Sequence, residues 1–516
     1  MPAAVLPWFA ISPSTLCLQP LSSHNASNAV DLHRLAGRNY HCHCGQPLFF
    51  RNSKCLACGT PLGYDCERGV LLSLMPGPQP DTWQAWQDPP PPQPQPVQAP
   101  VPQQVQSQVQ QQGQQPQGGL QAGGTAPPDN TPPPLLEQIP GQESAPPGMA
   151  LPVIGDAQFL SGQSGAPVYK RCLNLSTPAA CNWLIAVQDP HDMCRACRLN
   201  RTIPDLTDPA LPDNGYLWGL VELAKRRLVS SLIVLGLPVA SRVSEDPQRG
   251  LMFDFLRSPR NGPHVMTGHN TGLVTLNVDE ADDAKRETAR KAMREPYRTL
   301  LGHFRHEVGH YYWDRLVAGT PWMDGFRQLF GDESLDYRSS LQRNYSQGPP
   351  RDWPLHFVSA YASSHPWEDW AECWAHYLHL RDAIDTALSL GISVDRFELE
   401  FTPFTLDALY QPEHADAGQF LAFLNHWTRL TTLLNEMSRS MGQPDFYPFV
   451  LPRDVVAKLH FIHLVVTSGA WLQDPPLVPV HNQNQSQDPT RNQTQALPQI
   501  QPQTQASTQL QQENQL

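Results

Sequence analysis

Residues 300–317 read LLGHFRHEVGHYYWDRLV and contain two histidines four residues apart, with a glutamate directly after the first. On a helix, His306 and His310 project from the same face, so both imidazoles can bind one Zn²⁺ ion. Glu307 would then lie beside the metal as the general base for a water that the zinc activates. Because this HExxH pattern also occurs by chance in ordinary helices, the rest of the chain must supply a third ligand and a scaffold.

A catalytic zinc needs a third protein ligand and an open coordination position. The extended pattern HExxHxxGxxH would supply a third histidine, but this chain has Trp313 and Leu316 where that pattern requires Gly and His. The third ligand must therefore come from another element. The rest of the 300–317 helix is predicted to be buried, because it carries these apolar side chains: Phe304, Val308, Tyr311 and Tyr312.

Residues 365–388, HPWEDWAECWAHYLHLRDAIDTAL, are predicted to form a second helix with a polar face. Glu368 and Glu372 are four residues apart and share this face with His376 and His379. Buried carboxylates and imidazoles are costly without partners, so we expect this face to lie against the histidine helix. Alternatively, these side chains cap and hydrogen-bond to one another.

The region around these two helices, residues 166–472, is predicted to be α+β and mainly helical, with a small sheet. An aromatic stripe at helical spacing is expected to be core: Trp367, Trp370, Trp374 and Tyr377. Further helices are predicted at 215–237, at 282–317 with a break at Pro296, at 416–442 and at 452–469. Strands are predicted at 250–256 and 272–278, where apolar and polar residues alternate.

Residues 37–75 contain two short cysteine pairs, each followed by glycine, and are predicted to form a zinc ribbon. The four cysteines of this module are Cys42, Cys44, Cys55 and Cys58. Such a pattern is typical of two turns that hold one tetrahedral structural Zn²⁺, which would supply much of the folding energy of so short a module. His41 and His43 are alternative ligands.

Residues 166–205 contain a second group of four cysteines with a looser spacing: Cys172, Cys181, Cys194 and Cys197. We expect a second structural zinc here. The alternative is a set of packed free cysteines, with His191 as a further ligand. A sequence with clustered cysteines and no secretory signal favours metal binding over disulfides.

Residues 1–36 show little pattern and are assigned to an N-terminal tail. Two segments are predicted to be disordered: a Pro/Gln-rich linker at 76–165 and a Gln/Asn-rich tail at 473–516. The formal net charge is −12, without a long basic run, so nucleic acid is an unlikely partner. No window is long and apolar enough to predict a membrane helix. The chain is therefore expected to be cytoplasmic, with a protein partner at the ribbon or the tails as a further option.

The region 206–472 resembles the gluzincin metallopeptidases, in particular the lethal-factor-like toxins, through HEVGH and the downstream stretch YASSHPWEDWAE. In those proteins the third ligand is the first Glu of an ExxAE helix, with a Tyr seven residues upstream. The resemblance implies Glu368 as the third zinc ligand and Tyr361 as a donor to the oxyanion. It implies that Glu372 orients a zinc-binding histidine.

More closely, the chain resembles a bacterial family of zinc-binding metallopeptidases with an N-terminal zinc ribbon. The shared stretches are CHCGQPLFFRNSKCLACGTPLGY, CRACRLNRTIPDL, GHFRHEVGHYYWDRLV, SAYASSHPWEDWAECWAHYLHL and YPFVLP. The resemblance covers about 37–72 and 166–470, and it implies a zincin-like domain at 206–472 that hydrolyses a peptide or protein substrate. It also implies that an edge strand beside the histidine helix pairs with the substrate, and the 272–278 strand is the candidate.

Two other functions remain open at the level of the sequence. One is a non-catalytic zinc-binding adaptor that uses the ribbons and tails to bind partners. The other is a DNA-associated protease of the SprT-like type, which also combines HExxH with a zinc ribbon but uses a histidine as third ligand. His365, His376 and His379 are available for that role. The leading prediction is a zinc peptidase with one catalytic zinc and one or two structural zincs.

Overall fold

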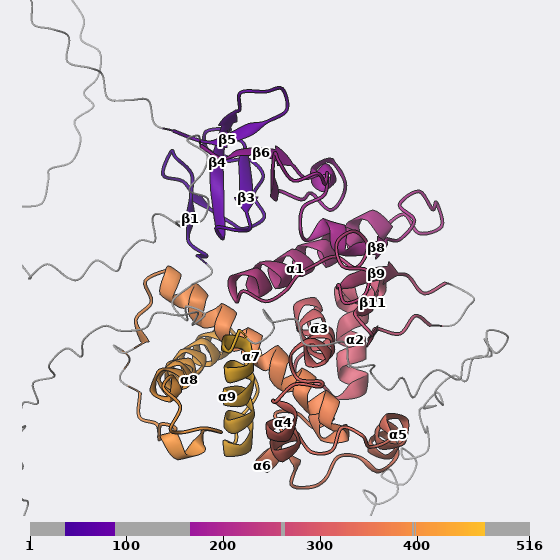
Figure 1. The fold of residues 1–516 in the computed structure, drawn as a ribbon, viewed down its shortest axis with the longest axis vertical. Coiled ribbons are helices and arrows are strands. Elements are labelled where there is room, and N and C mark those ends of the chain that lie inside the picture. Colours follow the sequence, from indigo (N-terminus) through magenta and orange to yellow (C-terminus); the bar gives the residue numbers. More distant parts are fainter. Residues whose placement is uncertain (1–36, 88–165, 260–263, 395–396, 398, 470–516) are drawn as a thin grey trace, which may run out of the picture. The chain divides into compact units, whose positions relative to one another are not determined.

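The computed structural model describes residues 37–87, 166–259, 264–394, 397 and 399–469, and every structural statement below concerns these residues. Helices and sheets are both present, as an α+β chain requires (Figure 1). The predicted tails at 1–36 and 473–516 lie outside the described residues, as does most of the predicted linker.

The two cysteine modules share one five-stranded antiparallel sheet. Its order is β3 (Leu62–Asp65), β4 (Val70–Pro76), β5 (Trp83–Ala85), β6 (Val168–Arg171) and β7 (Leu184–Ala186). A separate pair, β1 (Tyr40–His41) and β2 (Pro47–Leu48), precedes it. Strands β5 and β6 pair through Trp83 and Tyr169, so the segment between them is an insertion within one sheet.

Strand β5 corrects the start of the predicted linker, which the composition placed at residue 76. The physical reason is a contact between residues distant in sequence: the guanidinium of Arg171 on β6 lies 4.8 Å from the ring centroid of Trp83 on β5. Trp83 stands in a stretch that is otherwise rich in Pro and Gln, so composition alone hides this strand. The linker prediction for residues 88–165 lies outside the described residues.

A second sheet has the order β10 (Gly268–Asn270), β11 (Leu273–Asn277), β9 (Met252–Leu256) and β8 (Asn200–Thr202). Strands β11 and β8 flank β9 in parallel, whereas β10 is antiparallel to β11. The expectation that residues 272–278 form the edge strand is therefore wrong, because β10 covers that edge. A two-residue turn makes this possible: Thr271 and Gly272 have φ of 44° and 83°, as a tight hairpin requires.

The predicted helices are all present, and three short ones are additional. The helices are α1 (Asn214–Val234), α2 (Asp283–Met293), α3 (Leu300–Leu316), α4 (Met323–Phe330), α5 (Tyr337–Gln347), α6 (Trp353–His356), α7 (Pro366–Ser389), α8 (Ala417–Ser440) and α9 (Arg453–Thr467). The break near Pro296 has a cap on each side. Arg294 ends α2 in a left-handed conformation with φ of 56°, and the Thr299 hydroxyl accepts from the Gly302 N–H to begin α3.

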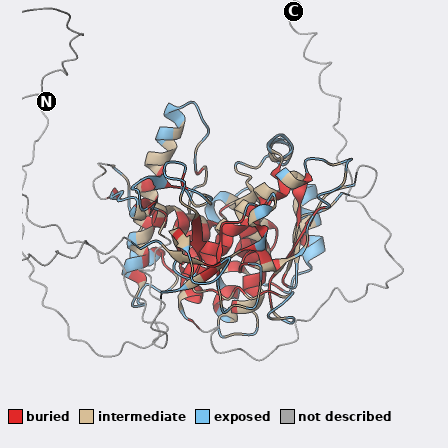
Figure 2. Ribbon diagram, turned by 90° about the horizontal axis from the view of Figure 1, so that it is seen from above, coloured by how far each residue is buried: buried red, intermediate tan, exposed pale blue. Residues whose placement is uncertain are grey.

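Helices α3 and α7 pack closely at Gly309, inside the HExxH motif. A Cβ atom at this position would lie 3.0 Å from the Cα of Ala371, so only glycine fits without a shift. The indole N–H of Trp370 donates to the Gly309 carbonyl at 2.8 Å, and Tyr312 stacks on Trp374 with ring centroids 4.9 Å apart. Both tryptophans are fully buried, as predicted for the aromatic stripe, and buried residues gather in the interior (Figure 2).

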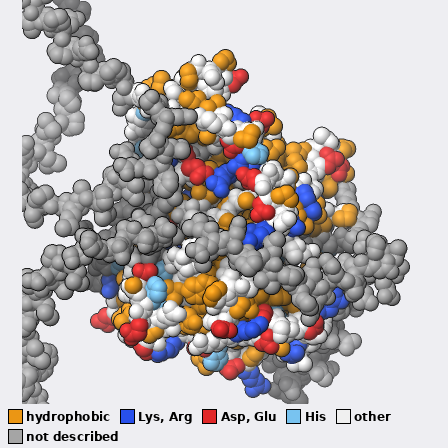
Figure 3. All heavy atoms as spheres, in the orientation of Figure 1, with side chains coloured by type: hydrophobic (Ala, Val, Ile, Leu, Met, Phe, Trp, Pro, Cys, Tyr) orange, Lys and Arg blue, Asp and Glu red, His pale blue; other side chains and the backbone are white. Residues whose placement is uncertain are grey.

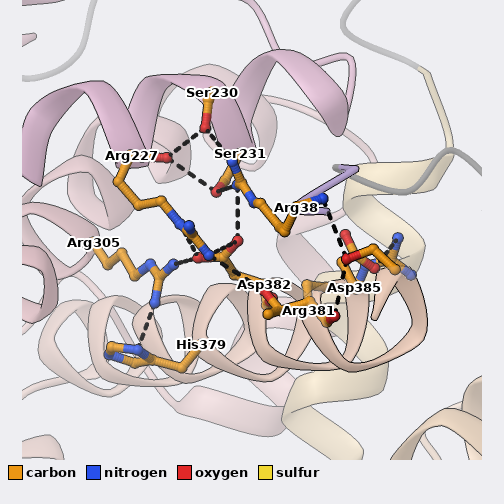
Figure 4. Close-up of polar contacts among 11 residues, drawn as sticks. Arg38, Arg227, Ser230, Ser231, Arg305, His379, Arg381, Asp382 and Asp385 are labelled. Atoms are coloured by element: carbon orange, nitrogen blue, oxygen red, sulfur yellow. Dashed lines mark hydrogen bonds and ion pairs between the residues drawn. The ribbon is translucent and has the colours of Figure 1, made fainter. Parts of the chain in front are cut away.

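The carboxylate of Asp382 on α7 joins three arginines from different parts of the chain (Figure 4). Arg38 donates at 2.8 Å from just before β1, Arg227 at 2.8 Å from α1, and Arg305 at 2.9 Å from α3. The carboxylate is buried, so it needs these partners to stay ionised. This network ties the start of the ribbon to the two helices that carry the candidate metal ligands.

The surface of the described residues carries both signs of charge. On the face seen in Figure 3, Lys and Arg side chains are interspersed with Asp and Glu side chains. Among the described helices, none combines the length and the apolar character needed to cross a membrane.

Candidate metal centre

Helices α3 and α7 bring His306, His310 and Glu368 together, with one ligand atom of each within 4.8 Å of the others. His306 Nε2 lies 3.0 Å from Glu368 Oε2, and His310 Nε2 lies 3.6 Å from Glu368 Oε1. A tetrahedral zinc with ligands at about 2.0–2.1 Å holds them about 3.3–3.4 Å apart. The donor types and the spacing therefore fit Zn²⁺.

The charges in this cluster follow from burial and close contact. Burial lowers the pKa of His306, but hydrogen bonds to Glu368 and Glu372 outweigh it and raise that pKa well above its ordinary value. Burial lowers the pKa of His310 to about 4, so its imidazole is neutral and has a free lone pair. Burial opposes ionisation of Glu368, but His310, which is protonated at the acidic pH where this carboxyl titrates, and His306 outweigh burial and hold the pKa of Glu368 well below the usual range.

Glu372 fixes the orientation of the His306 ring. Its Oε1 lies 2.7 Å from His306 Nδ1, and the Ser359 hydroxyl donates to its Oε2 at 2.7 Å. The carboxylate therefore holds a proton on Nδ1 and leaves Nε2 facing His310 and Glu368. This carboxylate–histidine arrangement is typical of zinc ligands.

Glu307 is half-buried beside the three candidate ligands. Burial raises the pKa of its carboxyl to about 7, while the charge of His306 opposes that rise. Among the described residues, none makes a hydrogen bond to this carboxyl. Such a group can accept and release a proton near neutral pH.

Two tyrosines border the cluster, and sequence reasoning found only one of them. Tyr361 begins the short turn η4 (Tyr361–Ser364), with its ring centroid 6.0 Å from that of His306. Burial, followed by the charge of Glu368, raises the pKa of Tyr361 well above its ordinary value, so its hydroxyl keeps its proton. The missed residue is Tyr337 on α5, whose hydroxyl donates to Glu368 Oε1 at 2.6 Å.

The three histidines considered as alternative ligands are engaged elsewhere. His365 caps α7 by accepting from the Trp367 N–H. His376 Nδ1 lies 2.6 Å from the Tyr447 hydroxyl, and His379 Nδ1 lies 2.5 Å from Arg305 Nη1. His376 and His379 therefore do not join the cluster. On the same face of α7, His379 contacts helix α3 through Arg305, as expected for this face, whereas His376 contacts Tyr447.

Two more histidines lie next to the cluster and were missed. His269 on β10 stacks on His310 with ring centroids 5.9 Å apart, and its Nε2 accepts from the Gly272 N–H. His303 lies one turn before the motif on α3, with its Nδ1 2.5 Å from Glu280 Oε2. The position of His303, three residues before His306 on the same helix, could have been used to predict that it lies near the cluster. The position of His269 depends on the hairpin at Thr271 and could not be predicted in this way.

The first cysteine cluster has the geometry of a tetrathiolate site. Its four Sγ atoms lie within 4.8 Å of one another, including Cys42 and Cys58 at 3.5 Å and Cys44 and Cys55 at 3.8 Å. Thiolates at about 2.3 Å from a tetrahedral zinc are about 3.8 Å apart. A hydrogen bond from the Thr60 hydroxyl lowers the pKa of Cys58 to about 5, which favours the thiolate.

The second cysteine cluster is buried, with all four Sγ atoms again within 4.8 Å: Cys172, Cys181, Cys194 and Cys197. Cys181 and Cys194 are 3.6 Å apart, and the Cys194 N–H donates to Cys172 Sγ. Burial opposes the charge of Arg226 on α1, but the nearby thiol groups and Glu222 raise the pKa of this guanidinium. The Arg226 guanidinium can thus offset part of the negative charge that four metal-bound thiolates would carry. His191 instead pairs with Asp189 at 2.8 Å.

Two cysteine clusters and one His–His–Glu cluster define a zinc-ribbon protein with a third, metallopeptidase-type site. Residues 214–465 match a family model described as "Putative zinc-binding metallo-peptidase". Residues 39–94 and 149–208 match a model described as a zinc-ribbon domain. The chain belongs to this family of zinc-binding metallo-peptidases, and the predicted resemblance is confirmed.

Relatives of the chain occur in mycobacteria. An uncharacterized protein of Mycobacterium bovis is 42% identical over 318 residues, which cover 60% of this chain and 85% of the relative. Uncharacterized proteins of two Mycobacterium tuberculosis strains show the same identity and coverage. No solved structure gives a significant match.

Proposed function

We propose that the chain is a zinc-dependent peptidase with its active centre between α3 and α7. The observation that carries this proposal is the convergence of His306, His310 and Glu368 beside Glu307, a half-buried carboxyl that makes no hydrogen bond to another described residue. A purely structural zinc would be closed by four protein ligands, whereas three leave a coordination position for water and substrate. When bound, the zinc would polarise that water and the substrate carbonyl.

The protein side chains around the metal have separate tasks in this proposal. Glu307 accepts a proton from the attacking water and delivers it to the leaving amine. Tyr361 donates a hydrogen bond to the oxyanion as the carbonyl carbon becomes tetrahedral. Glu372 keeps the His306 ring in the tautomer that presents Nε2 to the metal.

Strand β10 is the proposed guide for the substrate backbone. It is the edge strand of its sheet and packs beside α3, where His269 reaches His310. An extended peptide can add to such an edge through main-chain hydrogen bonds. The two cysteine clusters are proposed as structural zinc sites, because four thiolates leave no open position.

The alternative of a DNA-associated protease is less well supported. It needs a histidine as third ligand, but His365, His376 and His379 contact other partners. The net charge of −12 also disfavours binding to a phosphate backbone. The adaptor alternative differs in one respect: it predicts that loss of Glu307 leaves the function intact.

The proposal is tested by incubating the zinc-loaded full chain with a mixed peptide library and identifying new termini by mass spectrometry. Wild type is expected to cleave, and Glu307→Gln is expected to keep its zinc but lose cleavage by at least about 100-fold. Glu436→Gln is the matched control, because this carboxylate is exposed on α8 and pairs only with Arg439 among the described residues. Cleavage by Glu307→Gln at the wild-type rate would overturn the mechanism.

A further inference from the structure

We infer that Tyr337 is a positioning residue that holds the Glu368 carboxylate in the geometry needed to bind the metal through one oxygen. The inference rests on the proposed zinc site. The Tyr337 hydroxyl donates to Glu368 Oε1 at 2.6 Å, while Glu368 Oε2 lies 3.0 Å from His306 Nε2. The two oxygens thus have different partners. Oε2 lies against His306 Nε2, whereas Oε1, which is 3.6 Å from His310 Nε2, accepts the hydrogen bond from Tyr337.

Helix α5 lies largely at the surface. Of its residues, Ser340 is buried, and most of the rest are exposed. It packs on η4, the turn that carries Tyr361. Asp336 caps its start by accepting from the Ser339 N–H at 2.7 Å, which places Tyr337 in the first turn. The helix therefore presents the Tyr337 hydroxyl to Glu368 on α7.

His365 fixes this start of α5 relative to α7. Its Nδ1 accepts from the Trp367 N–H, so the proton is on Nε2, which donates to the Leu335 carbonyl at 3.1 Å. The Tyr337 ring packs edge-on against the imidazole, with centroids 5.2 Å apart. His365 was a candidate metal ligand, but it instead links the N-terminus of α7 to Tyr337, which contacts Glu368.

The hydrogen bond has a definite chemical consequence. A carboxylate with both oxygens free can bind a metal through either or both, whereas a donor on Oε1 leaves Oε2 for the metal. The Tyr337 hydroxyl is the donor in this contact, because a carboxylate that binds a metal carries no proton and can only accept. Loss of the hydroxyl should therefore weaken metal binding and alter coordination without removing a ligand.

Neighbouring Tyr345 provides a matched comparison on the same helix. It is about half-exposed, and its hydroxyl interacts with Tyr361 and makes no hydrogen bond to Glu368. Tyr345→Phe and Tyr337→Phe each remove one tyrosine hydroxyl from α5. A difference between the two variants therefore reports on the contact with Glu368 and not on the helix.

The test is a zinc titration of the full chain with both cysteine clusters loaded, which gives the dissociation constant of the remaining site. Tyr337→Phe is expected to weaken this site about 10- to 100-fold, and Tyr345→Phe is expected to match wild type. In the Co²⁺-substituted protein, the visible d–d bands of this site should shift in Tyr337→Phe alone. Wild-type affinity and spectrum in Tyr337→Phe, or equal losses in both variants, would overturn the inference.

A double-mutant cycle tests the link through His365. His365→Asn can still cap α7 but does not reach Leu335, so it should weaken zinc binding less than Tyr337→Phe does. In a chain that already carries Tyr337→Phe, adding His365→Asn should not weaken zinc binding further. Additive effects would contradict the link. If Glu368→Ala still binds as much zinc per chain as wild type, both this inference and the proposed site are refuted. If Tyr337→Phe weakens zinc binding as expected but the wild type cleaves no peptide, only the peptidase function is refuted.

Discussion

At the residue scale, the Glu372 carboxylate is shared between the His306 ring and the Ser359 hydroxyl. The contact of this carboxylate with His306 Nδ1 determines that Nδ1, and not Nε2, carries the ring proton. Glu372→Gln keeps the size of the side chain but can offer an N–H to Nδ1 and so favour the wrong tautomer. We expect the third zinc to bind about 10- to 100-fold more weakly, as measured by competition with a chelator. Unchanged affinity would mean that the ring is held by packing alone.

A second prediction concerns Tyr361. If its hydroxyl stabilises the oxyanion, Tyr361→Phe should lower kcat by roughly 100- to 1,000-fold while KM and zinc content change little. Steady-state kinetics on a peptide found in the library, with zinc content measured in parallel, separates these effects. A raised KM at unchanged kcat would instead place Tyr361 in substrate binding.

The sequence predicts part of this site well, because spacing within one helix is a local property. His306, Glu307 and His310 follow from helical periodicity, and the ExxAE resemblance adds Glu368. Tyr337 and His269 could not be predicted, because their contacts depend on a short helix and a hairpin whose placement is set by tertiary packing. Local patterns carry no information on such distant contacts.

At the scale of elements, the approach of α3 to α7 depends on Gly309. A Cβ atom there would meet the Ala371 backbone and the Trp374 ring at 3.0–3.3 Å. Gly309→Ala should therefore destabilise the fold by about 1–3 kcal/mol, despite the better helix propensity of alanine, and should weaken the third zinc. Chemical denaturation and zinc content measure the two effects.

The control for this substitution is Gly418→Ala on α8. A Cβ atom at Gly418 meets no atom within 4 Å among the described residues. Alanine should be neutral or stabilising there. If Gly309→Ala and Gly418→Ala have the same free energy of unfolding, α3 and α7 can move apart at Gly309 without loss of stability.

Elements with long apolar periodicity were predictable, and short ones were not. The apolar repeats of α1, α7 and α9 persist over several turns. Strand β10 and helix α6 span three and four residues, too few for a period to emerge. The signal for β10 was the Thr271–Gly272 turn, which also explains why β11 is not at the edge.

At the scale of the whole molecule, Asp382 links the ribbon to the helical region through Arg38, Arg227 and Arg305. Burial opposes ionisation of Asp382, but the three guanidiniums dominate and hold its pKa well below the usual range. A carboxyl with a depressed folded pKa stabilises the fold above its unfolded pKa of about 3.9, and this contribution is lost as the pH falls below it.

Asp382→Asn should therefore lower the free energy of unfolding by about 3–5 kcal/mol at pH 7. The difference from wild type should shrink below about pH 4, because the Asp382 carboxyl then takes up a proton in the unfolded chain while it is still ionised in the folded one. Denaturation curves at several pH values measure this. A difference that is constant from pH 7 to pH 3 would contradict the ionic role.

The pairing of β5 with β6 makes residues 88–165 an insertion within one sheet. Replacing this segment by a short Gly-rich turn should leave both cysteine clusters able to bind zinc. It should raise the free energy of unfolding by up to about 2 kcal/mol, because a shorter loop loses less entropy on closure. Loss of zinc from the cysteine clusters would show that the segment takes part in the fold.

The central claim is that one zinc lies between His306, His310 and Glu368, apart from the two cysteine clusters. Anomalous diffraction at the zinc edge, on crystals of the full chain, tests it most directly. Three peaks per chain are expected, two at the cysteine clusters and one within about 2.0–2.2 Å of the two Nε2 atoms and a Glu368 oxygen. The third peak should disappear in Glu368→Ala. In zinc-saturated crystals, no third peak, or one that is bound by a third histidine in place of Glu368, would contradict the claim.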